Sequence, residues 1–167
     1  KFIKEMNSFS EERLDTAALI NGKREFNYRQ LFRQWDRYAE VFFAMKIMEK
    51  NNSRVAMYGN VSAECIIAFY ALNMNGVPVS MLPVEESYDE ERWMEMIRKE
   101  EITDLIIAEV YAWPKFLNMI YFKKKELGLR NIIILPTYLD GPYAASVERL
   151  QARLYEQLLN LFPDFVR

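Results

Sequence analysis

The residue types that perform most enzyme chemistry are scarce in this chain. It contains no histidine, which excludes a serine-protease-like triad, a His-ligated zinc and histidine acid–base catalysis from these residues. Its single cysteine, Cys65, excludes an internal disulfide and a thiolate metal cluster, and a lone thiol is typical of a reducing compartment. Cys65 shares a predicted helix face with Ile66, Phe69 and Leu72, so we interpret it as a small buried apolar residue.

Glycine motifs that bind phosphate or present a nucleophile are also missing. The five glycines stand too far apart to form the G-x-G-x-x-G turn of a dinucleotide site. Neither the G-x-x-x-x-G-K-[ST] phosphate loop nor the G-x-S-x-G nucleophile turn occurs. We therefore assign no catalytic, cofactor-binding or metal-binding residue to this chain.

Three weaker features remain. Gly59 and Asn60 follow a predicted strand at its carboxyl end, where parallel sheets bind ligands, so they are candidates for the edge of a cleft. A plain turn is the alternative interpretation. The acidic residues between positions 85 and 91 lie before and within the first turn of a predicted helix, where negative charge is favoured. The lysines Lys123–Lys125 lie near the end of the next predicted helix. We interpret both runs as solvated helix ends rather than as metal or phosphate sites.

The elements that must position these residues begin with a hairpin and a long helix. Segments 16–20 and 25–28 are strand-like and flank Asn21-Gly22, a strong hairpin signal. Asn27 with Gln30 has capping-box spacing and opens a helix expected to run to about Met48.

A regular alternation of strands and helices follows. We expect strands at 54–58, 77–82, 104–108 and 131–135, and helices at 63–74, from the Ser87–Glu90 capping box to 100, and from Pro114 to Gly128. Apolar strands that alternate with helices favour parallel pairing and right-handed crossovers. The fold class is therefore α/β: a doubly wound, mainly parallel sheet with helices on both faces, an N-terminal hairpin and a C-terminal helix.

The end of the chain differs in pattern. Residues 137–144 contain Asp140-Gly141-Pro142, a loop signal, and residues 145–162 are amphipathic at helical spacing. We expect an α/β subdomain over residues 1–136 and a loop with an amphipathic helix over residues 137–167.

Charge and hydropathy exclude two classes of partner. The 22 Lys and Arg balance 24 Asp and Glu, so the basic excess of a nucleic-acid-binding protein is missing. The longest apolar run, Ile66–Leu72, is far shorter than the roughly 20 residues of a membrane-spanning helix. With no leader pattern at the start, we expect a cytoplasmic protein without a membrane span.

The order and spacing of four segments resemble a known family. The segments are 17–31 (hairpin and helix start), 54–60 (a strand like "D-R-V-A-I" and its loop), 68–83 (like "A-F-x-A-x-x-x-A-G-x-x-x-x-x-L-x-P") and 103–107 (a strand). Over roughly residues 15 to 135 the chain resembles the N-terminal portion of AMP-forming, adenylate-forming enzymes, the group of acyl-CoA synthetases and AMP-dependent ligases. In place of the family's usual Thr and Glu, Asn27 and Gln30 keep the capping chemistry.

The resemblance implies a function for the parent enzyme more than for this chain. Such enzymes activate a carboxylic acid with ATP and magnesium to an acyl-adenylate, and most pass the acyl group to CoA. Their phosphate loop and catalytic Lys lie later in the sequence and have no counterpart here, so this portion would bind no cofactor itself. Its partner would be the remainder of the ligase chain, and exposed apolar surface predicts a homodimer or poor solubility of the isolated portion.

Two alternatives stay open. A stand-alone, non-catalytic α/β binding or protein-interaction module would also lack every catalytic motif, with 145–162 as a closing helix or partner surface. A flavodoxin-like nucleotide binder is less favoured, because no strand is followed by the Ser/Thr/Gly-rich turn that such proteins use.

Overall fold

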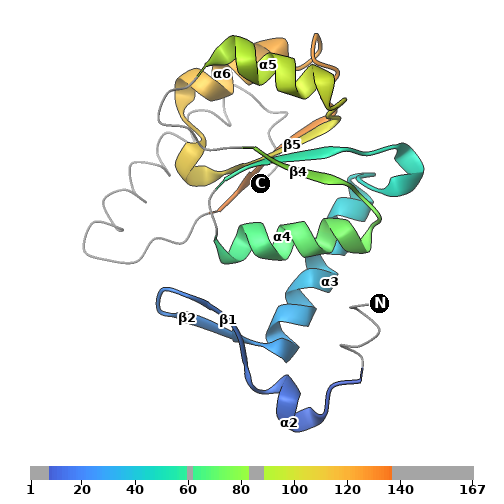
Figure 1. Ribbon diagram of the computed structural model, residues 1–167, viewed down its shortest axis with the longest axis vertical. Helices are drawn as coiled ribbons and strands as arrows, with labels where there is room; N and C mark the ends of the chain where they lie inside the picture. The colour runs from blue at the N-terminus through green and yellow to red at the C-terminus, as the bar shows by residue number, and fades with distance from the viewer. Residues whose placement is uncertain (1–7, 60–61, 83–88, 137–167) are drawn as a thin grey trace.

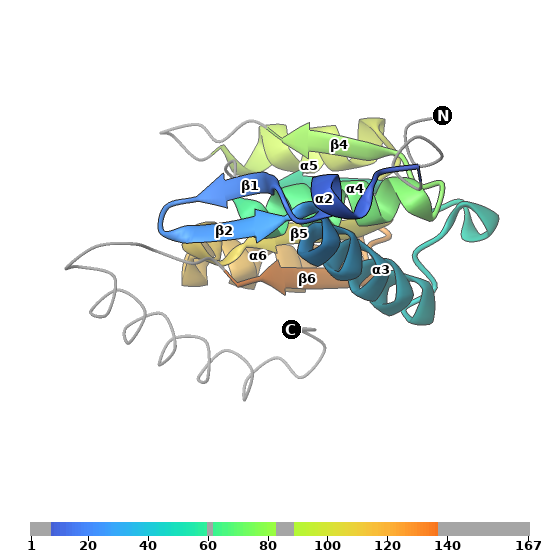
Figure 2. The ribbon, with the colours of Figure 1, turned by 90° about the horizontal axis from the view of Figure 1, so that it is seen from below.

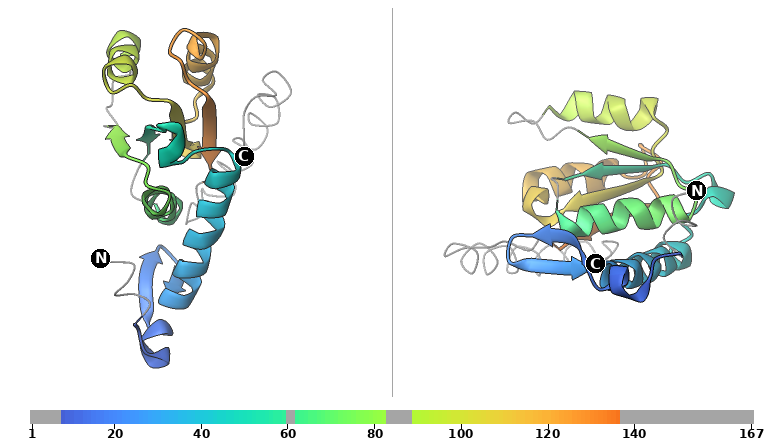
Figure 3. Two further views of the ribbon diagram at one scale, coloured as in Figure 1. Left: turned by 90° about the vertical axis from the view of Figure 1, so that its right-hand side faces the viewer. Right: turned by 60° about the horizontal axis from the view of Figure 1, so that its bottom comes forward.

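Four apolar strands form a parallel sheet in the computed structural model, which describes residues 8–59, 62–82 and 89–136. In spatial order they are β4 (Val79–Leu82), β3 (Val55–Tyr58), β5 (Asp104–Ala108) and β6 (Asn131–Leu135). Helices α3 (Tyr28–Ala44) and α4 (Ala63–Met74) cover one face, and α5 (Glu90–Lys99) and α6 (Pro114–Lys123) cover the other (Figure 1, Figure 3). The predicted doubly wound α/β fold is confirmed.

The core lies on both faces of this sheet because successive strand residues point in opposite directions. In β5, Leu105 and Ile107 pack among residues of α5 and α6. Ile106 and Ala108 pack instead against residues of α3 and α4. A strand buried on both faces must be apolar throughout, which explains the continuous runs in the sequence.

Side-chain caps fix where the helices begin. Asn27 and Gln30 form the predicted capping box at the start of α3. The Ser62 hydroxyl accepts a hydrogen bond from the backbone N–H of Cys65 and caps α4, which spans the predicted residues 63–74. The cap of α5 is Asp89, which accepts from the N–H of Arg92, and not Ser87 as the capping-box spacing predicted.

The helices end in a recurrent turn at the amino edge of the sheet. At the end of α3, the Ile47 N–H bonds to the Phe42 carbonyl at 2.8 Å, and the Lys46 N–H bonds to the Phe43 carbonyl at 2.9 Å. This is the Schellman pattern, which needs a residue with positive φ. The residues that supply it at the four helix-to-strand turns are Lys46 (φ 63), Gly76 (φ 71), Glu101 (φ 51) and Gly128 (φ 71).

These turns correct two predicted helix ends. α3 ends at Ala44 rather than near Met48, because Lys46 takes a left-handed conformation usually reserved for glycine. α6 ends at Lys123, and a further turn closed by Gly128 leads into β6. Short 3₁₀ helices occur at η1 (Glu49–Asn51) and η2 (Glu109–Tyr111).

The N-terminal unit consists of the short helix α2 (Glu11–Leu14) and a hairpin of β1 (Ala17–Asn21) and β2 (Arg24–Asn27). Asn21 pairs with Arg24, so the turn residues are Gly22 and Lys23, one position later than Asn-Gly predicted. The hairpin does not join the main sheet and lies on the far side of α4 from it (Figure 1, Figure 2). The helix predicted within 137–167 lies outside the described residues.

Candidate functional site

Gly59 lies where the strand order of the sheet reverses, at the carboxyl end of β3 beside the end of β5. Open α/β sheets bind ligands outside this point. A Cβ on residue 59 would lie 2.9 Å from the Cβ of Ala108 and 3.0 Å from the Sγ of Cys65. Close packing therefore requires glycine here. Asn60 lies outside the described residues, and a ligand role for the two residues remains a prediction.

Aromatic side chains fill the α5/α6 side of this edge. The ring of Tyr58, the last residue of β3, lies 4.6 Å from Trp93 and 5.3 Å from both Phe116 and Tyr111, centroid to centroid. Tyr58, Trp93 and Phe116 are buried, and Tyr111 packs against the core on both faces of the sheet. This side of the edge is therefore closed by packing.

An ion pair occupies the α3/α4 side of the same edge. Glu64, the second residue of α4, accepts a 2.5 Å hydrogen bond on Oε1 from Nη2 of Arg24, the first residue of β2. Glu64 is only 9% exposed, and its Oε2 is buried without a hydrogen-bond partner. The dipole of α4 favours this carboxylate in the first turn of the helix, and the sequence analysis did not predict its partner on the hairpin.

The residues around Glu64 have shifted pKa values. Burial raises the pKa of the Tyr38 phenol, and the negative charge of Glu64 raises it further. Burial also raises the pKa of the Cys65 thiol, against the hydrogen bond with Ser62, which lowers it. Cys65 is a free, buried thiol, which confirms its interpretation as an apolar core residue.

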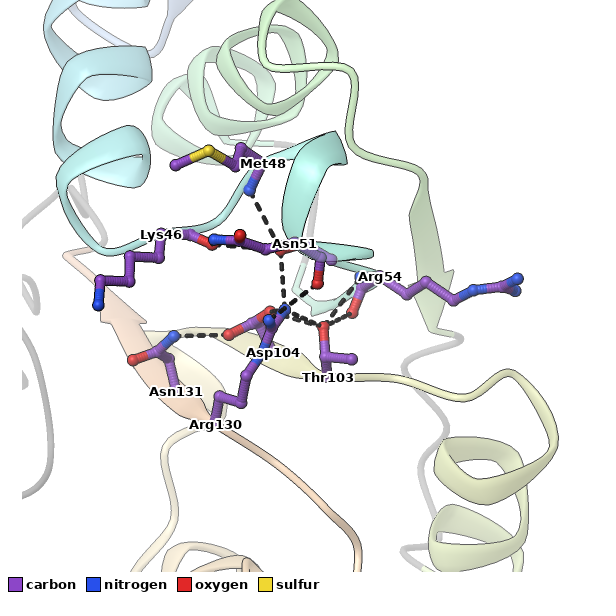
Figure 4. Close-up of polar contacts among 9 residues, drawn as sticks. Lys46, Met48, Asn51, Arg54, Thr103, Asp104, Arg130 and Asn131 are labelled. Atoms are coloured by element: carbon purple, nitrogen blue, oxygen red, sulfur yellow. Dashed lines mark hydrogen bonds and ion pairs between the residues drawn. The ribbon is translucent and has the colours of Figure 1, made fainter.

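A larger polar network ties the amino ends of three strands together (Figure 4). The carboxylate of Asp104 is fully buried at the start of β5. Its Oδ2 accepts hydrogen bonds from Nη2 of Arg130 at 2.7 Å and from the Thr103 hydroxyl at 2.6 Å. Its Oδ1 accepts from the side-chain amide of Asn131 at 2.6 Å. Both carboxylate oxygens are therefore satisfied.

Arg130 extends this network to the connection between α3 and β3. Its Nη2 also donates to the Ser53 hydroxyl at 2.8 Å, and its Nη1 donates to the Asn51 carbonyl at 3.1 Å. The sequence contains a signal for this network that was not used in the prediction. Two consecutive polar residues lie at or just before the start of each of the three strands: Ser53-Arg54, Thr103-Asp104 and Arg130-Asn131. Because this cluster lies opposite the edge at which parallel sheets generally bind ligands and its carboxylate is satisfied, we assign it a structural role.

Metal-ligating side chains do not gather in the part of the chain that the structure describes. Within 8–59, 62–82 and 89–136, no group of three or more acidic or cysteine residues is placed to hold a metal ion. Glu90 and Glu91 lie in the first turn of α5, and Lys123 in the last turn of α6 pairs with Glu126 at 2.9 Å, so these residues contribute to helix ends. Glu85 and Glu86 lie outside the described residues. None of the helices in these ranges has the length and apolar character needed to cross a bilayer.

Comparison with protein families identifies the chain. Residues 7–152 match the family described as AMP-binding enzyme. The chain belongs to the AMP-binding enzyme family. Membership implies ATP and magnesium for the complete enzymes.

Solved structures of family enzymes share the fold. An anthranilate CoA ligase in complex with anthranoyl-AMP is 16% identical with a TM-score of 0.61, over 80% of this chain and 24% of the ligase. MatB from Rhodopseudomonas palustris is 17% identical with a TM-score of 0.58, over 78% of this chain and 24% of its own. A luciferase-like enzyme from the nonluminescent Zophobas morio mealworm is 16% identical with a TM-score of 0.58, over 75% and 29%.

These matches define what the chain corresponds to. It spans about a quarter of the length of the solved structures that it resembles. It is thus homologous to the N-terminal part of adenylate-forming ligases. The family resemblance of the four segments between residues 17 and 107 predicted this correspondence. A comparison with curated protein sequences gave no match.

Proposed function

We propose that this chain is the N-terminal subdomain of an ATP-dependent, AMP-forming acyl-CoA synthetase or a closely related ligase. The observation that carries the proposal is the family match over residues 7–152. The reaction joins a carboxylate to the α-phosphate of ATP, which gives an acyl-adenylate and releases pyrophosphate. In most branches the thiol of CoA then displaces AMP.

In this proposal the chain is a scaffold, and it contributes no catalytic group. The nucleotide, magnesium and CoA contacts belong to the remainder of the ligase. The carboxyl edge of β3 and β5, beside Gly59 and Asn60, borders the cleft for the carboxylic acid. The parent enzyme is cytoplasmic in this account.

The remainder of the ligase is the proposed partner, and exposed apolar side chains support this. Val41, Phe43, Trp113 and Phe122 are each more than half exposed. Exposed apolar surface of this kind marks interaction sites. In the isolated chain the same surface would drive formation of a homodimer, and light scattering across a concentration series would detect it.

Exchange of radioactive pyrophosphate into ATP tests the proposal, because it reports reversal of adenylate formation. The native protein should catalyse exchange that depends on one carboxylic acid from a panel. The 167-residue chain alone should give none. A native protein that contains this chain and supports no exchange with any acid would contradict the proposal and favour a non-catalytic interaction module.

A further inference from the structure

The hairpin of β1 and β2 is shallowly attached to the rest of the molecule. No residue of either strand is fully buried, and Ile20 is 67% exposed. The small core beneath the hairpin contains three buried residues, Leu31, Trp35 and Ile67. Native proteins open locally where buried apolar contacts are few.

The tip of the hairpin makes a defined polar contact with α4. Arg24 directly follows the Gly22-Lys23 turn and pairs with Glu64 at the start of α4. Figure 1 shows the turn of the hairpin on the same side of the molecule as this end of α4. The hairpin thus covers the first turn of α4, close to Gly59 at the carboxyl edge of β3.

The closed contact leaves one buried acceptor unsatisfied. Oε2 of Glu64 is removed from water and receives no hydrogen bond. A buried polar atom without a partner destabilises the state that buries it. Opening the tip would return this oxygen to water. The unsatisfied oxygen therefore destabilises the closed state at the Arg24–Glu64 contact.

We propose that the β1–β2 hairpin is a strap that opens at the Arg24–Glu64 contact and uncovers the first turn of α4 at the carboxyl edge of the sheet. The opening is local, because α4 and the sheet stay packed against each other. Cys65 provides an internal reference. Its thiol packs among sheet residues in the core and lies against Gly59, whereas the hairpin lies on the other side of α4. The inference does not rest on the proposed enzymatic function.

Two variants at the contact should change the opening in opposite directions. Arg24→Met leaves the Glu64 carboxylate without its donor. Amide hydrogen exchange in β1 and β2 should then accelerate about tenfold, the change that one further uncompensated buried polar group produces. The double variant Arg24→Met with Glu64→Met removes both charges and the unsatisfied oxygen. An apolar replacement of a buried pair is often neutral or stabilising, so exchange should return to the wild-type rate or below it.

A matched control is available at the opposite edge of the sheet. Arg54 pairs with Glu101 across 3.5 Å with both side chains largely exposed. Arg54→Met makes the same substitution there and should leave exchange in the hairpin unchanged.

Three results would overturn the proposal. The first is hairpin exchange that is as slow as exchange in β5 in the wild-type chain, since no local opening would then exist. The second is a double variant that exchanges as fast as Arg24→Met. The third is labelling of the Cys65 thiol that accelerates in parallel with hairpin exchange, because the opening would then be global unfolding.

Discussion

Two buried carboxylates, one at each edge of the sheet, are treated in opposite ways. At the amino edge, Asp104 is fully buried, and three side-chain donors satisfy both of its oxygens. At the carboxyl edge, Arg24 donates to one oxygen of Glu64, and the other oxygen is buried without a partner. A fully satisfied buried network makes a structure rigid, whereas a buried polar atom without a partner destabilises the state that buries it.

The difference separates a fixed edge from an adaptable one. The amino edge also carries the four Schellman turns, so helix ends and strand starts are tied together there. The carboxyl edge carries the helix starts, the Gly59 packing contact and the hairpin strap. Ligand sites in parallel sheets occur at the carboxyl edge, and a rigid opposite edge supports such a site without taking part in it.

The largest effect should follow from breaking the Asp104 network. Asp104→Ala removes the carboxylate to which Arg130, Thr103 and Asn131 all donate. Because a hydrogen bond to a charged group contributes about 1.5–3 kcal/mol, we expect a combined loss of about 3–5 kcal/mol. Urea unfolding followed by circular dichroism should show this loss. Asn51→Ala keeps the backbone carbonyl that Arg130 uses and should lose far less. Equal losses in the two variants would contradict a network centred on Asp104.

A smaller loss should follow from filling the space at Gly59. Gly59→Ala places a methyl group against Ala108 and Cys65. Overpacking of this kind costs about 1–3 kcal/mol in the free energy of unfolding. The double variant Gly59→Ala with Ala108→Gly should recover part of that loss. Simple additivity of the two single changes would show that residues 59 and 108 are not in contact.

A gain should follow from two changes at the amino edge. Lys46 and Glu101 hold positive φ values without being glycine. Lys46→Gly and Glu101→Gly should each stabilise the chain by about 0.5–1 kcal/mol, because relief of left-handed strain exceeds the added freedom of the unfolded chain. Thermal unfolding would measure the shift. A lower melting temperature in both variants would contradict the strain argument.

The smallest effect should come from alkaline pH at the carboxyl edge. Tyr38 and Cys65 have pKa values raised above their ordinary values of 10.0 and 9.0, both chiefly by burial, with Glu64 adding to each. Arg24 and Arg37 oppose the shift at Tyr38. The folded state therefore holds these protons more tightly than the unfolded state does. The stabilisation is complete below about pH 9 and is lost as pH rises through the folded pKa values.

Urea midpoints measured across that alkaline range would test the pH effect. The combined variant Tyr38→Phe with Cys65→Ala should show a shallower decline than the wild-type chain. An unchanged slope would mean that neither group differs in pKa between the folded and unfolded states.

The predicted bounds of helices and strands were most accurate where a local sequence signal marks them. α4 begins at the predicted residue, directly after its cap Ser62. β5 and β6 have the predicted bounds because an apolar run between polar residues defines a buried strand. The predicted end of α3 was wrong because nothing in the sequence indicates that Lys46 has a positive φ. The contacts of Asp104 with Arg130 and of Glu64 with Arg24 join residues 26 and 40 positions apart. Only the folded topology brings such residues together, so these contacts could not be predicted from local patterns in the sequence.

The length of the native polypeptide tests the central claim most directly. If this chain is the N-terminal subdomain of an AMP-forming ligase, the intact mass of the native protein will far exceed 19.9 kDa. The sequence beyond Arg167 will then contain a Ser/Thr/Gly-rich phosphate loop and a later catalytic Lys. A native protein of 19.9 kDa that ends at Arg167 would contradict the ligase account.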